Sequence, residues 1–201
     1  MSEPKTDDWV IYQGRTFKRV VRWETEPVVY KPITAVSQAA PVAITASGHG
    51  LKSGWYAAVT DVKGMTEINA QSNAPKASDY HQVTVSDVDT ITINDINAAG
   101  FSAYKSGGYL RYNTPVDITG AVVRANIRDR VGGTLLLSLS TVTGEIVLDT
   151  VNHTISITIP ATVTQVIGYT KGVYDLEAAI GTEVTVLTVG SVNVIPEITT
   201  E

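Results

Sequence analysis

The segment 152–159, NHTISITI, alternates polar and apolar side chains. Strict alternation with a period of two predicts a β-strand that has one face in a hydrophobic core. An extended conformation would put four side chains of this segment on one face: His153, Ile155, Ile157 and Ile159. The residues that follow, 160–167, form either a short helix that begins at Pro160 or an irregular crossover between sheets.

The same signal recurs elsewhere in the chain. Residues 83–93, VTVSDVDTITI, alternate in two short runs. Residues 183–195, EVTVLTVGSVNVI, are dense in valine and threonine, whose branched side chains suit a pleated sheet. Turn residues, among them the Gly-Gly pairs at 107–108 and 132–133, separate the candidate strands at short intervals. We therefore predict an all-β chain with an immunoglobulin-like antiparallel β-sandwich.

Two passages interrupt the strand pattern in a way that suggests an insertion. The first, AVSQAAPVAITASGHG, is rich in small residues, and the second, YNTPVDITG, precedes a series of long regular strands. We expect a discontinuous β-sandwich domain made of residues 8–32 and 112–198, into which residues 34–110 are inserted as a small β-module. Exposed loop tips tolerate such insertions because few contacts cross them.

Charge and cysteine content exclude several classes of function. The formal net charge is −5, whereas a protein that binds nucleic acid irrespective of sequence needs a basic face. The chain has no cysteine, which removes disulfides, thiolate nucleophiles and cysteine-ligated zinc. The first ten residues, MSEPKTDDWV, lack the apolar core of a secretory signal, and no apolar run is long enough to span a membrane. We expect neither a nucleic-acid partner nor a membrane partner.

The stretch 48–70, GHGLKSGWYAAVTDVKGMTEINA, holds the most suggestive pair for chemistry, His49 and Glu67. His49 is a candidate general base or metal ligand. The glycines on either side favour a different interpretation, a turn histidine whose ring hydrogen-bonds to nearby backbone. The Gly-x-Gly pattern neither continues to GxGxxG nor enters a predicted helix, so it is not a dinucleotide loop. Four residues are expected to set turns here: Gly48, Gly50, Gly54 and Gly64.

The remaining histidines and acidic residues do not form a recognisable site. His81 and His153 have no partner at the spacing of a metal motif. The run 86–100, SDVDTITINDINAAG, has an isoleucine at the third EF-hand ligand position and no closing glutamate. Asx turns at two strand ends are the favoured interpretation, and a cation held by Asp87 and Asp89 is the alternative. We expect no catalytic residues, no cofactor-binding residues, no metal ligands and no cofactor, and hence no enzyme.

The segments that flank the expected insertion resemble a β-sandwich domain of phage proteins. Before the insertion stands QGRTFKRVVRW, residues 13–23. After it come NTPVDITGAVVRANIRD, residues 113–129, then GVYDLEA and VLTVGSVNVI. In this order they are similar to the N-terminal domain of baseplate upper proteins, which also occurs in many short phage tail proteins. The resemblance covers more than half of the chain and implies a β-sandwich.

The expected insertion resembles a small β-module of phage structural proteins. The segments GHGLKSGW, VKGMTEINA and AYKSGGY carry this resemblance, which runs from about residue 41 to residue 109. The module is labelled by analogy with the first catalytic-cysteine half-domain of ubiquitin-activating enzymes, although this chain has no cysteine. The chain departs from the module at 71–82, QSNAPKASDYHQ, where the family has a shorter connection.

Together the resemblances imply a virion structural protein of a tailed phage, assembled in the tail, baseplate or neck as an adaptor or attachment component. Its partners would be other virion proteins, and it would form a homo-oligomer within the particle. Two alternatives stay open, a capsid decoration protein and a carbohydrate-binding module for host adsorption. The three tryptophans and nine tyrosines could supply a surface for the latter, although most are expected in the core or at its rim.

Overall fold

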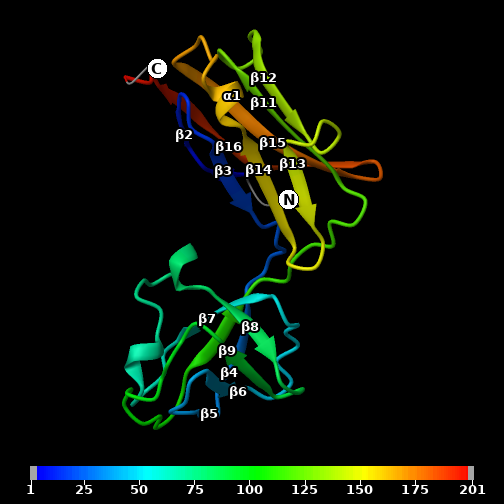
Figure 1. Cartoon of the computed structure of the whole chain (residues 1–201). Coiled ribbons are helices and arrows are strands. Elements are labelled where there is room, and N and C mark those ends of the chain that lie inside the picture. The colour runs from blue at the N-terminus through cyan, green and yellow to red at the C-terminus, as the bar shows by residue number, and fades with distance from the viewer. Residues whose placement is uncertain (1–3, 199–201) are drawn as a thin grey trace. The chain divides into compact units, whose positions relative to one another are not determined.

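The computed structural model describes residues 4–198, and strands make up most of its regular structure (Figure 1). The predicted all-β class is confirmed. The chain divides into two compact units, each with its own hydrophobic core. Unit 1 joins the segment that ends at Trp23 to the segment that begins at Asp117, and unit 2 is Glu24–Val116.

The larger sheet of unit 1 has six strands and is mostly antiparallel. Its two longest strands form the centre, and the two N-terminal strands both pair in parallel with the last strand of the chain. In spatial order the strands are β1 (Lys5–Thr6), β16 (Glu183–Ile195), β15 (Lys171–Ile180), β11 (Val122–Arg128) and β12 (Leu135–Ser140), while β2 (Trp9–Tyr12) also pairs with β16.

The smaller sheet of unit 1 has three strands in the order β13 (Ile146–Asp149), β14 (Thr154–Ile159) and β3 (Phe17–Val21). Ile155, Ile157 and Ile159 of β14 are fully buried, as the alternation predicts. They share one core with Trp9, Leu139 and Leu176 of the larger sheet, and this common core makes unit 1 a two-layered sandwich.

His153 does not lie on the core face of β14, contrary to the prediction. The strand begins at Thr154, and His153 belongs to the preceding turn with a φ of 53°. A left-handed residue breaks the extended backbone, so the alternation cannot extend back to it. At the other end of the strand, α1 (Ala161–Thr164) follows Pro160, which occupies the N-cap position. The helix is shorter than the predicted 160–167.

Unit 2 contains seven strands in one sheet and two short 3-10 helices, η1 (Thr66–Ile68) and η2 (Ala77–Asp79). Its neighbouring strands are all antiparallel. In spatial order they are β4 (Val29–Pro32), β10 (Tyr109–Tyr112), β7 (Tyr56–Thr60), β8 (His81–Val85), β9 (Thr90–Ile93), β6 (Val42–Thr45) and β5 (Ala35–Val36).

The two ends of this sheet meet, because the terminal strands β4 and β5 are separated by only two residues. The first of these, Ile33, donates its backbone N–H to the carbonyl of Gly108, next to β10, at 2.9 Å. The second, Thr34, donates its N–H to the carbonyl of Thr45 in β6, also at 2.9 Å. The sheet therefore curls into a small barrel around the core of unit 2, in which β4 and β5 each pair with one neighbour among the described strands.

The chain enters and leaves unit 2 through paired backbone. Glu24 forms a bridge with Pro115, and the N–H of Thr25 donates to the carbonyl of Thr114 at 2.8 Å. Residues 24–32 and 112–116, which were expected in the flanking sandwich, lie in unit 2, where β4 pairs with β10 along its whole length.

Candidate functional site

His49 lies in a tight turn, and its ring is committed to backbone groups. Its side chain is buried, with 1% of the residue exposed. The N–H of Leu51 donates to Nδ1 at 3.0 Å, so Nδ1 carries the lone pair and Nε2 carries the proton. Nε2 lies 3.1 Å from the carbonyl oxygen of Asp87 and donates to it. The ring thus fastens the turn to a loop far away in the sequence, as a structural group.

The glycines of this turn have the predicted conformations. The backbone φ angles of the four expected turn residues are all positive: Gly48 54°, Gly50 72°, Gly54 91° and Gly64 91°. At Gly64 the backbone is also crowded, because a Cβ would stand 2.3 Å from the carbonyl oxygen of Ala103. Only glycine fits there without a shift of the neighbouring chain.

Glu67 is engaged away from His49. Its Oε1 accepts hydrogen bonds from the backbone N–H of Ser102 at 2.9 Å and from the Ser102 hydroxyl at 2.8 Å. These bonds, led by the backbone N–H, hold the pKa of Glu67 below its ordinary value. The two residues that suggested a site in the sequence therefore serve two different loops.

The acidic run distributes its side chains among separate partners. Asp87 Oδ1 accepts from the N–H of Asp89 at 2.8 Å, and Asn97 Oδ1 accepts from the N–H of Ala99 at 3.0 Å, which are the expected Asx turns. Asp89 Oδ1 accepts from the N–H of Gly48 at 2.7 Å. Within residues 4–198, no group of three or more histidine, aspartate or glutamate side chains is arranged to hold a metal ion.

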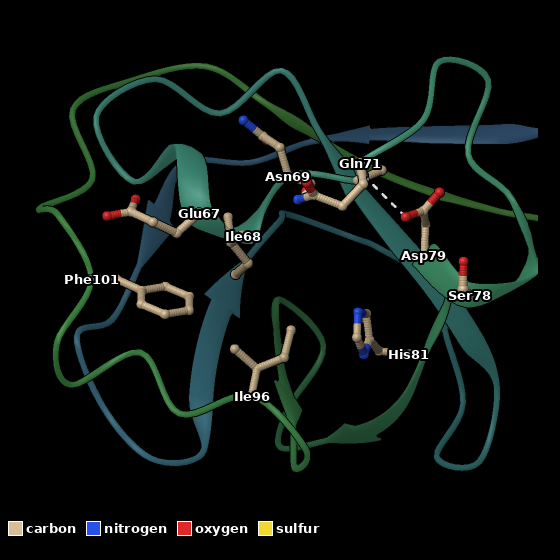
Figure 2. Close-up of a pocket in the computed structure, with 10 residues that line it drawn as sticks. Glu67, Ile68, Asn69, Gln71, Ser78, Asp79, His81, Ile96 and Phe101 are labelled. Atoms are coloured by element: carbon tan, nitrogen blue, oxygen red, sulfur yellow. Dashed lines mark hydrogen bonds between the residues drawn. The ribbon is translucent and has the colours of Figure 1, made fainter.

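A pocket of about 280 Å³ opens in the wall of unit 2, beside both 3-10 helices (Figure 2). We call it the η pocket. Its lining comes from the segment 67–71, from η2, from the start of β8 and from the loop that follows β9. The lining residues are Glu67, Ile68, Asn69, Ala70, Gln71, Ser78, Asp79, His81, Ile96 and Phe101.

Asp79 organises one end of the η pocket. It is buried, with 7% of the residue exposed. Its Oδ2 accepts from the backbone N–H of Lys76 at 2.8 Å, and its Oδ1 accepts from the N–H of Gln71 at 3.0 Å. These backbone bonds, first that of Lys76, hold the pKa of Asp79 below its ordinary value. The carboxylate is therefore ionised at neutral pH and fixes both ends of the loop 71–76.

His81 is held in the η pocket by a second carboxylate. Its Nδ1 lies 2.8 Å from Oδ2 of Asp95. Because an ionised carboxylate only accepts hydrogen bonds, Nδ1 carries a proton, and Nε2 is an acceptor whenever the ring is neutral. In Figure 2 the imidazole points into the pocket between Ile96 and Gln71. Asp95 thereby fixes the tautomer and the orientation of the ring.

Sequence reasoning treated His81 as isolated and did not single out Asp79 or Phe101. The only signal was the segment 71–82, where a longer connection than in the resembled module was expected. That segment forms η2 and supplies Ser78, Asp79 and His81 to the pocket. It thus builds one wall of the pocket.

In unit 1 the most distinctive surface feature is strand β12. Among the described strands it pairs with β11 on one side and with none on the other. Its sequence, LLLSLS, contains neither a charge nor a proline, which are common protections of edge strands. Leu135 is 47% exposed, and Leu136 and Leu137 pack only partly against the core. The edge offers unpaired backbone groups flanked by apolar side chains.

Comparison with known families finds a match within unit 2. Residues 41–112 match the model described as the ubiquitin-activating enzyme E1 FCCH domain, and these residues form most of unit 2. This part of the chain is therefore similar to that small β domain. Comparison with curated proteins finds no match to the chain. No helix within residues 4–198 is long and apolar enough to cross a membrane.

Proposed function

We propose that this chain is a structural protein of a tailed-phage virion, assembled in the tail, baseplate or neck as an adaptor or attachment component. The observation that carries the proposal is the open edge of β12 in unit 1. The resemblance of the flanking segments to phage baseplate domains also supports the proposal. Other virion proteins and further copies of this chain are the proposed partners.

The physical basis is strand addition. An unpaired edge can accept a partner strand through main-chain hydrogen bonds, and half-buried leucines beside it give that strand apolar surface to cover. The terminal strands of unit 2 are less suited to strand addition, because β4 contains Lys31 and Pro32 and β5 has only two residues. Unit 1 would therefore dock to the particle, while unit 2 would present loops and pockets.

Purified particles test the location. Virions from a strain that carries this gene would be banded in a density gradient and analysed by quantitative mass spectrometry. A ring in the tail or neck predicts about six or twelve copies per particle, as cyclic symmetry requires. Hundreds of copies would favour the capsid decoration alternative, and absence from intact particles would overturn a virion role altogether.

A matched pair of variants tests the docking edge. Leu135→Lys places a charge on β12, whereas Leu135→Ala removes a similar amount of apolar surface without adding charge. Because Leu135 is exposed, both proteins should keep the native fold. We expect Leu135→Lys to be lost from particles and Leu135→Ala to be retained. Equal incorporation of both variants would show that β12 is not the contact.

One observation favours a second candidate, a carbohydrate-binding module for host adsorption. Tyr30 and Tyr109 lie on the outer wall of unit 2, with 51% and 42% of each residue exposed. Their ring centroids are 6.2 Å apart at an interplanar angle of 86°, and the Arg111 guanidinium lies 5.6 Å from the centre of the Tyr30 ring. Exposed aromatic faces suit stacking against sugars. A glycan array with Tyr30→Ala as control would decide.

A further inference from the structure

The η pocket has two chemically different ends. In Figure 2, Asp79 and Ser78 lie at one end, and Ile68 and Ile96 lie in the middle. Phe101 lies at the other end beside Glu67, whose carboxylate is bound to Ser102. The imidazole of His81 points into the space near the polar end. A ligand that fills the pocket must therefore combine a polar head with an apolar stem.

The polar end offers hydrogen-bond acceptors. The ionised Asp79 carboxylate supplies negative charge, and its two oxygens also accept from the backbone N–H groups of Gln71 and Lys76. Nε2 of His81 is an acceptor when the ring is neutral, with the proton on Nδ1 beside Asp95. Nε2 of Gln71, the amide donor of that side chain, is already bound to the carbonyl of Asn69 at 3.1 Å, which leaves the amide oxygen available. The head of a matching ligand must carry several donors.

The charge of the lining has one sign. Glu67 and Asp79 are the ionised residues among the ten that line the pocket, and none of the ten is lysine or arginine. Asp95 adds a third carboxylate behind His81. A concave site lined by one sign of charge concentrates ligands of the opposite sign, so the lining favours a cation and disfavours anions.

We propose that the η pocket binds an alkyl cation, a guanidinium or ammonium head on an aliphatic stem. The head lies against Asp79 and His81, and the stem lies over Ile68 and Ile96 toward Phe101. This inference does not rest on the proposed virion role. The ligand comes either from a basic side chain of a partner protein or from a free small amine, because both present the same group.

The size of the pocket limits the ligand. Sites for drug-sized molecules begin at roughly 300 Å³. The η pocket, at about 280 Å³, suits a single side chain or a compact small molecule. A ligand of so few atoms binds weakly, with an expected Kd of about 1 mM.

Two isosteric ligands provide the first test. The full chain, labelled with ¹⁵N, would be titrated with butylguanidinium and separately with butylurea, which has the same shape without the charge. We expect saturable shifts with butylguanidinium at the amides of Gln71, Asp79 and His81, and at least tenfold weaker binding of butylurea. Equal binding of the two, shifts outside the pocket, or no saturable shift up to about 100-fold above the expected Kd would overturn the proposal.

Variants locate the two ends of the ligand. His81→Phe keeps an aromatic ring but removes the acceptor Nε2, and it should weaken butylguanidinium binding about tenfold, as expected for a hydrogen bond to a charged group. Phe101→Ser should weaken binding by shortening the apolar wall. Glu145→Gln removes a carboxylate of unit 1 and serves as the matched control. If the control lost as much affinity as His81→Phe, the binding would be non-specific attraction to net charge, and the proposal would fail.

A second pair of ligands separates the two sources. N-acetyl-arginine methylamide represents a basic side chain within a peptide, and agmatine represents a free amine with the same head. Binding of the methylamide at least as tight as that of agmatine supports a partner protein. Binding of agmatine alone supports a small molecule. Failure of both would contradict the proposal while leaving the virion role of unit 1 unaffected.

Discussion

The carboxylate of Asp89 caps the backbone of Gly48, a residue 41 positions earlier in the chain, through a hydrogen bond of 2.7 Å. The same oxygen accepts from the hydroxyl of Ser47 at 3.1 Å. Two residues before Asp89, the carbonyl oxygen of Asp87 accepts a hydrogen bond from Nε2 of His49. These hydrogen bonds join the Gly-His-Gly turn to the loop between β8 and β9, and they stabilise unit 2 through contacts between residues far apart in the sequence.

Acid should weaken the hydrogen bonds that Asp89 accepts from this turn. The hydrogen bond from Gly48, followed by that from Ser47, lowers the pKa of Asp89 from its ordinary value of 3.8. A depressed pKa in the folded state stabilises the protein above pH 3.8, and this stabilisation disappears as the pH falls through the folded-state pKa. Carboxyl ¹³C titration should show the depressed pKa. The unfolding free energy of Asp89→Asn should depend less on pH below 4 than that of the unchanged chain.

Replacing His49 tests whether the ring is structural. His49→Ala leaves the N–H of Leu51 and the carbonyl of Asp87 without their partners and opens a space in the turn. We expect a loss of about 3 kcal/mol in the free energy of unfolding, measured in urea. His81→Ala, at a position whose side chain is 27% exposed, should cost less than about 1 kcal/mol. Similar losses for both variants would contradict the structural role of His49.

Tyr174 should make unit 1 sensitive to alkali. Burial raises its pKa from 10.0 to about 12, and its hydroxyl donates to the carbonyl of Asp7 at 2.6 Å. A raised folded-state pKa gives stability that is complete below pH 10.0 and is lost as the pH rises toward 12. Tyr174→Phe should cost about 1 kcal/mol at neutral pH. That difference should shrink above pH 10, because the phenylalanine variant has no ionisable group there. A difference in stability between the two proteins that stays constant across this pH range would refute the raised pKa of Tyr174.

Unit 2 should fold when it is cut out of the chain. Its first and last residues are close together, since Glu24 bridges Pro115, and its core belongs to it alone. A protein of residues 24–116 should give an amide spectrum that overlays the corresponding signals of the full chain. A fragment of residues 34–110 lacks all of β4 and the second half of β10, and we expect it to be much less stable. A disordered spectrum from the longer fragment would show that unit 2 depends on unit 1.

Local patterns predicted the features that local physics controls. The alternation at 154–159 gave the strand β14 and its buried isoleucines, because side chains on an extended backbone point to opposite faces in turn. Positive φ angles at Gly48 and Gly50 followed from residue type, since other side chains clash in that conformation. His153 shows the limit of such patterns, because one left-handed residue ended the strand where the alternation continued.

Tertiary structure alone decided which distant segments meet. The closure of the barrel through Ile33 and Thr34 depends on β4 and β5 pairing with opposite ends of the same sheet. The η pocket likewise joins Ile68 of η1, Asp79 of η2 and Phe101 of the loop that follows β9. The sequence by itself determines which side chains of a strand share a face and which residues can adopt the backbone conformation of each turn. Strand partners and pocket walls are set by the packing of the whole core, since non-local contacts form only where that packing offsets the entropy of closing long loops.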